Sequence, residues 1–151
     1  MPGCSPCRCC RPREAARVAA WIVSPLFLSN KGNTHFVRVD SIAELDQKLA
    51  APGKPVMLDF YADWCVSCKE MEAYTFSDAR VKQELDGMLL LQADVTANMP
   101  EHKALLKRFH LFGPPGIVFF DAQGRELQGL RVIGYQNAER FLKTLDLAEV
   151  P

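Results

Sequence analysis

Two cysteines separated by two residues stand near the middle of the chain, in the stretch "YADWCVSCKEME". Cys65 and Cys68 could clamp a metal ion, staple the fold, or form a dithiol that exchanges electrons with other thiols. A zinc site needs two further ligands, and none of the three histidines is paired with another at ligand spacing. A small fold stabilised by disulfide bonds would have cysteines spread along its sequence, but the body of the chain holds only this pair. The dithiol interpretation is therefore favoured.

The segments around the pair support the same chemistry. The run "VMLDFYA" before Cys65 is almost continuously apolar, as in a strand covered on both faces, and the residues after Cys65 favour a helix. Cys65 is therefore expected at a helix N-terminus, where unpaired N–H groups and the helix dipole stabilise a thiolate. One turn later, Cys68 can attack a mixed disulfide at Cys65 and release the partner in its reduced form. Cys65 is the candidate nucleophile and Cys68 the resolving thiol.

Strand and helix signals alternate along the body of the chain. Strands are predicted in the runs "FVRV", "VMLDFYA", "MLLLQADV", "GIVFFD" and "RELQGLRVIGY". Ser41 and Glu44 form a capping box for the first helix, Ser77 is expected to cap a helical stretch through Leu85, and Asn137 is expected to cap the last helix. The order β-α-β-α-β-α-β-β-α predicts an α/β fold with a mostly parallel central sheet, helices on both faces and a final antiparallel hairpin.

The composition limits the functions to consider. The chain has 151 residues, 48% of them hydrophobic, which suits one domain with a sizeable core plus a tail. Eighteen basic residues balance eighteen acidic ones, so no general field attracts nucleic acid or an anionic membrane. Partners are therefore expected to be recognised locally.

Residues 1–34 differ in character from the rest and are expected to lie outside the fold, which leaves residues 35–151 as the domain. Four arginines precede an apolar run from Val18 to Leu28, which is too short to span a bilayer. Three interpretations stay open: a leader that is disordered or artificial in origin, an imperfect export signal, and a remnant of an adjoining membrane segment. Four cysteines lie within its first ten residues. Because no partner pair at zinc-ligand spacing follows them in this segment, a zinc site there is not favoured.

Short motifs carry a resemblance to a known family. The order of elements, "WCVSC" and "FGPPG" resemble the thioredoxin superfamily. Longer stretches, "VMLDFYADWCVSCKEMEAYTFSD", "LLQADVTAN" and "IVFFDAQGRE", look more specifically like the C-terminal periplasmic domain of the thiol:disulfide interchange proteins called DsbD. The resemblance runs from about Phe36 to Leu147 and implies a thioredoxin fold, in which helices flank both faces of a central mixed sheet.

This resemblance implies a thiol:disulfide oxidoreductase that works as a reductant, in other words a protein-disulfide reductase. Domains of that family take electrons from a membrane-embedded dithiol domain and pass them to an N-terminal periplasmic domain of the same protein, in support of disulfide isomerisation and cytochrome c maturation. The implied redox group is the cysteine pair itself, without cofactor or metal, in a monomeric periplasmic domain of an inner-membrane protein. Two alternatives stay open: a free-standing thioredoxin-like general disulfide reductase, and a docking module without enzymatic activity.

The resemblance also implies roles for single residues. Cys65 matches the attacking cysteine of the family and Cys68 the resolving one. Asp59 matches the buried acid beneath the active site, and Glu72 matches a second acid near the cysteines. Pro115 matches the cis-proline that faces the dithiol and docks the partner's chain.

Electrostatics explains how Asp59 and Glu72 could influence the cysteine pair. An Asp inside an apolar strand has its ionised form disfavoured, so the pKa of Asp59 should rise and its carboxyl group can relay a proton to or from Cys68. Glu72 follows Cys68 by four residues and is hence one helical turn away. Two carboxylates beside the dithiol oppose thiolate formation at Cys65, which predicts a reducing dithiol. Glu72 has a simpler alternative, as a solvated helix residue.

Trp64, Pro114 and Pro115 are the expected partner-binding residues. A tryptophan before the nucleophile can shield the sulfur and contact a docked chain. Relatives often carry Thr after the cis-proline, whereas this chain has Gly116. Because Pro114 has no N–H, a hydrogen bond from that position to a partner is lost. The lysine that cytosolic thioredoxins carry near the buried acid is missing from "MLLLQADV", which points away from a general thioredoxin.

Overall fold

The structure, a computed structural model, describes residues 34–148. Its strands are β1 (Val37–Arg38), β2 (Val56–Tyr61), β3 (Leu89–Asp94), β4 (Gly116–Phe120) and β5 (Glu126–Ile133). Its helices are α1 (Ile42–Leu49), α2 (Val66–Glu70), α3 (Ala79–Leu85), α4 (Pro100–Arg108) and α5 (Ala138–Ala148), with a π-helical segment η1 (Met71–Thr75) between α2 and α3.

The described strands form one sheet in the order β1-β3-β2-β4-β5. β1, β2 and β3 run parallel, β4 runs antiparallel to β2, and β5 runs antiparallel to β4. The sheet is therefore mixed, and its antiparallel part is larger than the predicted terminal hairpin because β4 already reverses beside β2. β2 has a neighbour along each edge and is buried from Val56 to Phe60, as its apolar sequence predicts.

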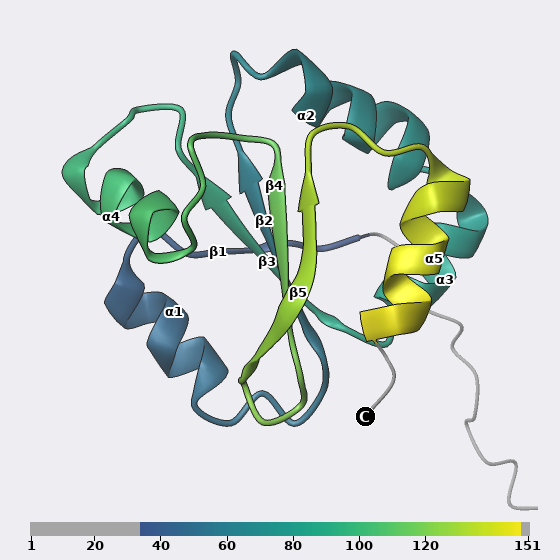
Figure 1. The fold of residues 1–151 in the computed structure, drawn as a ribbon, viewed down its shortest axis with the longest axis horizontal. Coiled ribbons are helices and arrows are strands. Elements are labelled where there is room, and N and C mark those ends of the chain that lie inside the picture. The colour runs from purple at the N-terminus through teal and green to yellow at the C-terminus, as the bar shows by residue number, and fades with distance from the viewer. Residues whose placement is uncertain (1–33, 149–151) are drawn as a thin grey trace, which may run out of the picture. The chain divides into compact units, whose positions relative to one another are not determined.

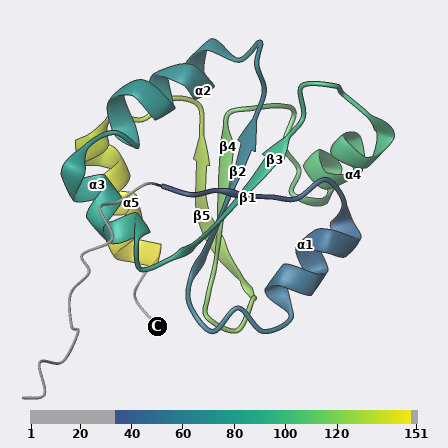
Figure 2. The same cartoon turned by 180° about the vertical axis from the view of Figure 1, so that it is seen from behind.

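Helices cover both faces of this sheet, which confirms the predicted α/β thioredoxin-type fold (Figures 1 and 2). α1 and α4 lie on one side, and α3 and α5 lie on the other. Side chains of β2 alternate between two hydrophobic cores: Leu58 and Phe60 join the core that includes α1 and α4, and Met57 joins the core of α3 and α5. By the same alternation, Asp59 faces the side of α3 and α5.

Two of the predicted helix starts are confirmed. Ser41 caps α1 by accepting a hydrogen bond from the Glu44 N–H (3.3 Å), while the Glu44 carboxylate reaches back to the N–H of Asp40 (2.8 Å). Asn137 precedes α5 and accepts a hydrogen bond from the Arg140 N–H (3.0 Å). Each of these contacts satisfies an N–H group that has no partner within the helix.

The predicted cap at Ser77 is wrong by one residue. Asp78 is the N-cap of α3, because its carboxylate accepts the N–H of Arg80 at 2.9 Å. The Ser77 hydroxyl donates instead to the carbonyl oxygen of Ala73 (2.6 Å), one turn back in the preceding helical segment. That segment contains the π-helical turn η1, which the sequence did not predict.

The predicted leader falls on residues 1–34, and apart from Thr34 it lies outside the described residues, as do its four cysteines. The interpretations given for it therefore stay predictions. Among the residues that the structure describes, no helix is both long enough and apolar enough to cross a bilayer.

Candidate active site

Cys65 and Cys68 are joined by a disulfide bond at the point where the chain turns from β2 into α2. Cys65 is the N-cap of α2, and its Sγ accepts a hydrogen bond from the Cys68 N–H at 3.1 Å. The two Cα atoms are 5.3 Å apart. Both side chains are largely buried, with 6% of Cys65 and 4% of Cys68 exposed. A thiolate at Cys65 would therefore sit against the N–H groups of a helix start, as the sequence predicts.

The resolving position lies directly over the central strand. Cys68 Sγ is 3.9 Å from the carbonyl oxygen of Phe60 in β2. Once the disulfide is reduced, this oxygen can accept a hydrogen bond from the Cys68 thiol. Cys68 is thereby held on the inner side of the pair, against the sheet, in a site with little access to solvent.

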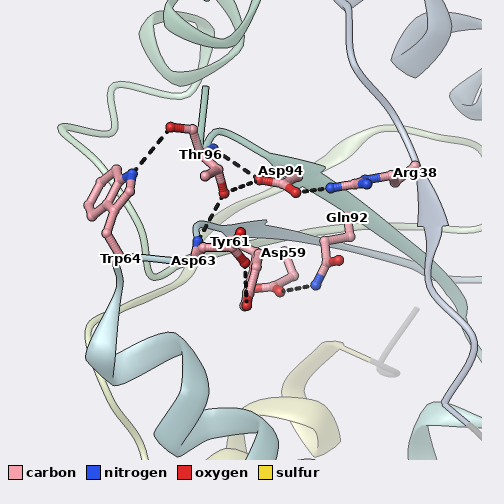
Figure 3. Close-up of polar contacts among 8 residues, drawn as sticks. All are labelled: Arg38, Asp59, Tyr61, Asp63, Trp64, Gln92, Asp94 and Thr96. Carbon is pink, nitrogen blue, oxygen red and sulfur yellow. Dashed lines mark hydrogen bonds and ion pairs between the residues drawn. The ribbon is translucent and has the colours of Figure 1, made fainter. Parts of the chain in front are cut away.

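Asp59 lies in the centre of the sheet and is only 5% exposed. Its neighbours across the two strand pairings are Gln92 on β3 and Ile117 on β4. Burial raises the pKa of Asp59 from 3.8 to about 7, opposed by a hydrogen bond from Gln92 and assisted by the negative charge of Glu72. Gln92 Nε2 donates this bond to Asp59 Oδ2 at 3.2 Å (Figure 3). The group is therefore poised to exchange a proton near neutral pH.

Glu72 lies on η1, beyond the end of α2, and its side chain is exposed. Partial desolvation raises the pKa of Glu72, the positive charge of Lys69 lowers it, and the negative charge of Asp63 raises it. Among the described contacts, Glu72 makes no hydrogen bond to Asp59 or to either cysteine. Glu72 acts on Asp59 through its negative charge, and its role beside the dithiol stays a prediction.

Replacing Gln92 with lysine tests what holds the pKa of Asp59. An ammonium group at this position would favour the ionised carboxylate, so the pKa of Asp59 should fall by about 1–3 units. The matched variant Gln92→Met removes the hydrogen bond without adding charge and should raise the same pKa, because that bond lowers it. Titration of the labelled Asp59 carboxyl carbon by NMR measures both shifts. Shifts in the same direction in the two variants would contradict this account.

The Pro114–Pro115 peptide bond is cis, which matches the geometry implied by the family resemblance. Gly116, the next residue, pairs with Phe60 near the end of β2, and the carbonyl oxygen of Pro115 accepts the N–H of Gly134 at 3.1 Å. The proline loop therefore lies at the same end of β2 as the turn that carries the disulfide. Both prolines are partly exposed, and their docking role stays a prediction.

Trp64 stands immediately before Cys65, and 60% of its side chain is exposed. Its indole N–H donates to the carbonyl oxygen of Thr96 at 3.3 Å (Figure 3). Two other large apolar side chains near the dithiol and the proline loop, Val66 and Phe112, are also exposed. An exposed apolar surface beside a reactive pair is suited to contact with a partner protein.

Sequence reasoning missed Gln92 and Thr96. Both belong to "LLQADVTAN", a run whose pattern predicts a strand and carries a family motif but does not single out site residues. A signal was present, because the ends of parallel neighbouring strands meet at one edge of a sheet, and polar residues gather at the end of this run. The pairing of β2 with β3 brings them beside Asp59 and Asp63.

No group of three or more potential metal ligands occurs among residues 34–148. The redox-active group that the structure does contain is the disulfide between Cys65 and Cys68. A disulfide and its dithiol form interconvert by exchange with other thiols and carry two electrons.

Comparison with known proteins finds relatives that are thioredoxin-like or are named as thiol:disulfide interchange proteins. A family of thioredoxin-like domains matches residues 43–149. The chain is 58% identical over 113 residues to thiol:disulfide interchange protein DsbD of Ralstonia nicotianae, covering 73% of this chain and 18% of that protein. It is 52% identical over 126 residues to DsbD of Pectobacterium atrosepticum, covering 80% of this chain and 21% of that protein. The chain thus spans about a fifth of the length of these curated relatives.

Solved structures superpose on three quarters of this chain. The reduced form of the DsbD C-terminal domain of Neisseria meningitidis superposes with a TM-score of 0.62 at 41% identity, covering 75% of this chain and all of that one. A thioredoxin from Thermus thermophilus superposes with a TM-score of 0.58 at 26% identity, covering 75% of this chain and 87% of that one.

Proposed function

Because the chain belongs to the thioredoxin-like family, and within it to the DsbD C-terminal domains, we propose that it is a thiol:disulfide oxidoreductase that reduces protein disulfides. The observation that carries the proposal is the Cys65–Cys68 disulfide at the start of α2, beside a buried strand that holds Asp59. Its relatives named as interchange proteins favour the same chemistry. The chain acts as a protein-disulfide reductase without a cofactor other than this pair.

The proposed reaction begins with reduced Cys65 and Cys68. The Cys65 thiolate attacks one sulfur of the partner's disulfide, so that a Cys65–partner bond forms and the partner's own S–S bond breaks. Cys68 then gives up its proton, with Asp59 as the proposed acceptor, and its sulfur attacks Cys65. The Cys65–Cys68 bond forms as the Cys65–partner bond breaks, and the partner leaves with two thiolates that take protons from Asp59 and from solvent. Two electrons have then moved to the partner. Glu72 assists by raising the pKa of Asp59.

The proposed place of this reaction is an electron relay between domains. The chain receives electrons from a membrane-embedded dithiol domain and passes them to an N-terminal periplasmic domain of the same DsbD-like protein, as a periplasmic part of an inner-membrane protein. Trp64, Pro114 and Pro115 form the surface on which these partner domains dock. The alternative is a general disulfide reductase that serves many clients.

Electron transfer to a purified partner domain tests the proposal. The chain, with its four N-terminal cysteines changed to serine, is reduced and mixed with the oxidised N-terminal domain of DsbD from Ralstonia nicotianae, and free thiols are trapped over time. We expect transfer of one electron pair per chain, at a rate well above that for insulin. Insulin reduction equal to that by a thioredoxin, in an assay with thioredoxin reductase, would favour the general reductase. If the parent chain bound the partner domain without transferring electrons, and Cys65→Ser left that binding and its function intact, a docking module would be favoured.

A further inference from the structure

The turn before the nucleophile Cys65 is held by a residue of the turn that follows β3. β3 ends at Asp94, and the next residue, Val95, donates its N–H to the carbonyl oxygen of Tyr61 at 2.8 Å. This bond keeps the chain after β3 alongside the chain after β2. Thr96 consequently lies next to the residues that immediately precede Cys65.

Thr96 contacts two consecutive residues of that turn. Its Oγ1 accepts a hydrogen bond from the N–H of Asp63 at 2.9 Å, and its carbonyl oxygen accepts the indole N–H of Trp64 at 3.3 Å (Figure 3). The first contact fixes the backbone two residues before Cys65. The second fixes the direction of an aromatic side chain that is 60% exposed and that has no such anchor within its own turn among the described hydrogen bonds.

The orientation of Thr96 is set in turn by an acidic residue. Asp94 Oδ1 accepts the Thr96 N–H at 2.9 Å and also accepts the Thr96 hydroxyl. A hydroxyl has a single hydrogen, so donation to Asp94 leaves an oxygen lone pair for the N–H of Asp63. Asp94 is paired with Arg38 of β1 (Figure 3). Strands β1 and β3 and the turns that follow β3 and β2 therefore contribute to one chain of contacts that ends at Trp64.

We propose that Thr96 is a positioning residue for disulfide exchange: the contacts Arg38–Asp94–Thr96 hold Asp63 and Trp64 so that Cys65 meets a docked protein partner. This inference rests on the proposed function, because it assigns Trp64 to the partner-binding surface. Thr96 does not touch the reacting sulfurs and acts through the turn before Cys65. Its loss therefore affects large partners that need the Trp64 surface, and leaves small disulfides that reach the sulfur directly.

The test compares Thr96→Val, which keeps the shape and removes the hydroxyl, with Thr96→Ser, which keeps the hydroxyl. Both are made in the full chain with its four N-terminal cysteines changed to serine, so that only Cys65 and Cys68 react, and with Trp21→Phe, because the sequence has two tryptophans and Trp64 should alone fluoresce. The rates of reduction of insulin and of the small aromatic disulfide 5,5′-dithiobis(2-nitrobenzoate) are measured, together with acrylamide quenching of Trp64 and the reduction potential. Arg38→Gln serves as a second, milder variant, since Arg38 is 61% exposed and its loss leaves the core intact.

We expect Thr96→Val to slow insulin reduction by about three- to tenfold, as for the loss of one hydrogen bond, mainly through a higher KM. The rate of reduction of the small disulfide should stay within twofold of the parent chain, and the reduction potential should not differ from it beyond experimental error. Acrylamide quenching of Trp64 should increase. Thr96→Ser restores the parent values, and Arg38→Gln moves them in the same direction as Thr96→Val by a smaller factor.

Two outcomes overturn the inference: unchanged quenching and insulin kinetics in Thr96→Val, or an equal loss for both disulfides that Thr96→Ser does not restore. The second would mean that Thr96 merely supports the fold. If the parent chain reduced neither disulfide, the proposed function would fail, but quenching needs no turnover and would still decide whether Thr96 positions Trp64.

Discussion

Cys68→Ser is expected to convert the protein from a reductant into a trap for its partners. Cys65 can still attack a partner's disulfide, but no second thiol is present three residues later to release it, so a mixed disulfide accumulates. Cys65→Ser, in contrast, removes the nucleophile and should reduce turnover to background, because a serine hydroxyl does not form a comparable nucleophile without an activating base. These are the largest effects that the account predicts.

Non-reducing electrophoresis and mass spectrometry of the chain mixed with an oxidised partner domain measure this difference. The N-terminal cysteines are replaced by serine in every sample, so that Cys65 is the sole thiol of the Cys68→Ser variant. The adduct should contain one chain and one partner joined by a disulfide bond, and added dithiothreitol should cleave that bond. Accumulation of the adduct in Cys65→Ser instead of Cys68→Ser would reverse the assigned roles.

Asp59→Asn is expected to make the protein more stable at alkaline pH and less active. Burial raises the pKa of Asp59 from 3.8 to about 7, so between these pH values the folded state holds a proton that the unfolded state has lost. Stability therefore falls as pH rises through this window, by about 4 kcal/mol for three pKa units at most. Asparagine does not ionise, so the variant should lack this loss: it gains relative to the parent at pH 8 and not at pH 4.

Activity should move in the opposite direction to stability. Loss of the proton acceptor should slow the attack of Cys68 by about 10²-fold, and the dependence of this step on pH near 7 should disappear. Urea unfolding of the oxidised proteins at pH 4, 6 and 8 measures stability, and stopped-flow release of a partner from the mixed disulfide measures the step. Asp146→Asn, an exposed change on α5, is the matched control. An equal stability difference at pH 4 and pH 8 would contradict the assigned pKa.

Much of the fold could be predicted because local signals agree with the final structure. The apolar run of β2 is buried as the sequence indicates, and the caps at Ser41 and Asn137 lie where the residue types place them. Ser77 and Asp78 are both good capping residues, and the choice between them depends on whether the preceding helix captures the serine hydroxyl. The π-helical turn η1 has no comparable local signature.

The residues of the candidate site also fall into two groups: those that a local pattern identifies and those that only the fold brings together. Cys65 and Cys68 could be identified from spacing and from the strand-to-helix junction, and the burial of Asp59 follows from its apolar neighbours. Gln92 and Thr96 reach the site only because β3 pairs with β2 in one particular register, across 33 residues of sequence for both the Asp59–Gln92 and the Asp63–Thr96 contacts. Such long-range partners depend on strand pairing, which no local pattern specifies.

The reduction potential of the Cys65/Cys68 pair tests the central claim, a dithiol that donates electrons, most directly. The chain with its N-terminal cysteines changed to serine is equilibrated in glutathione buffers, and free thiols are trapped and counted. The account predicts a value of about −200 mV or lower, towards the thioredoxin end of the known range. A value near about −120 mV, like that of the oxidant DsbA, would mean that the pair accepts electrons from its partners and would contradict the account.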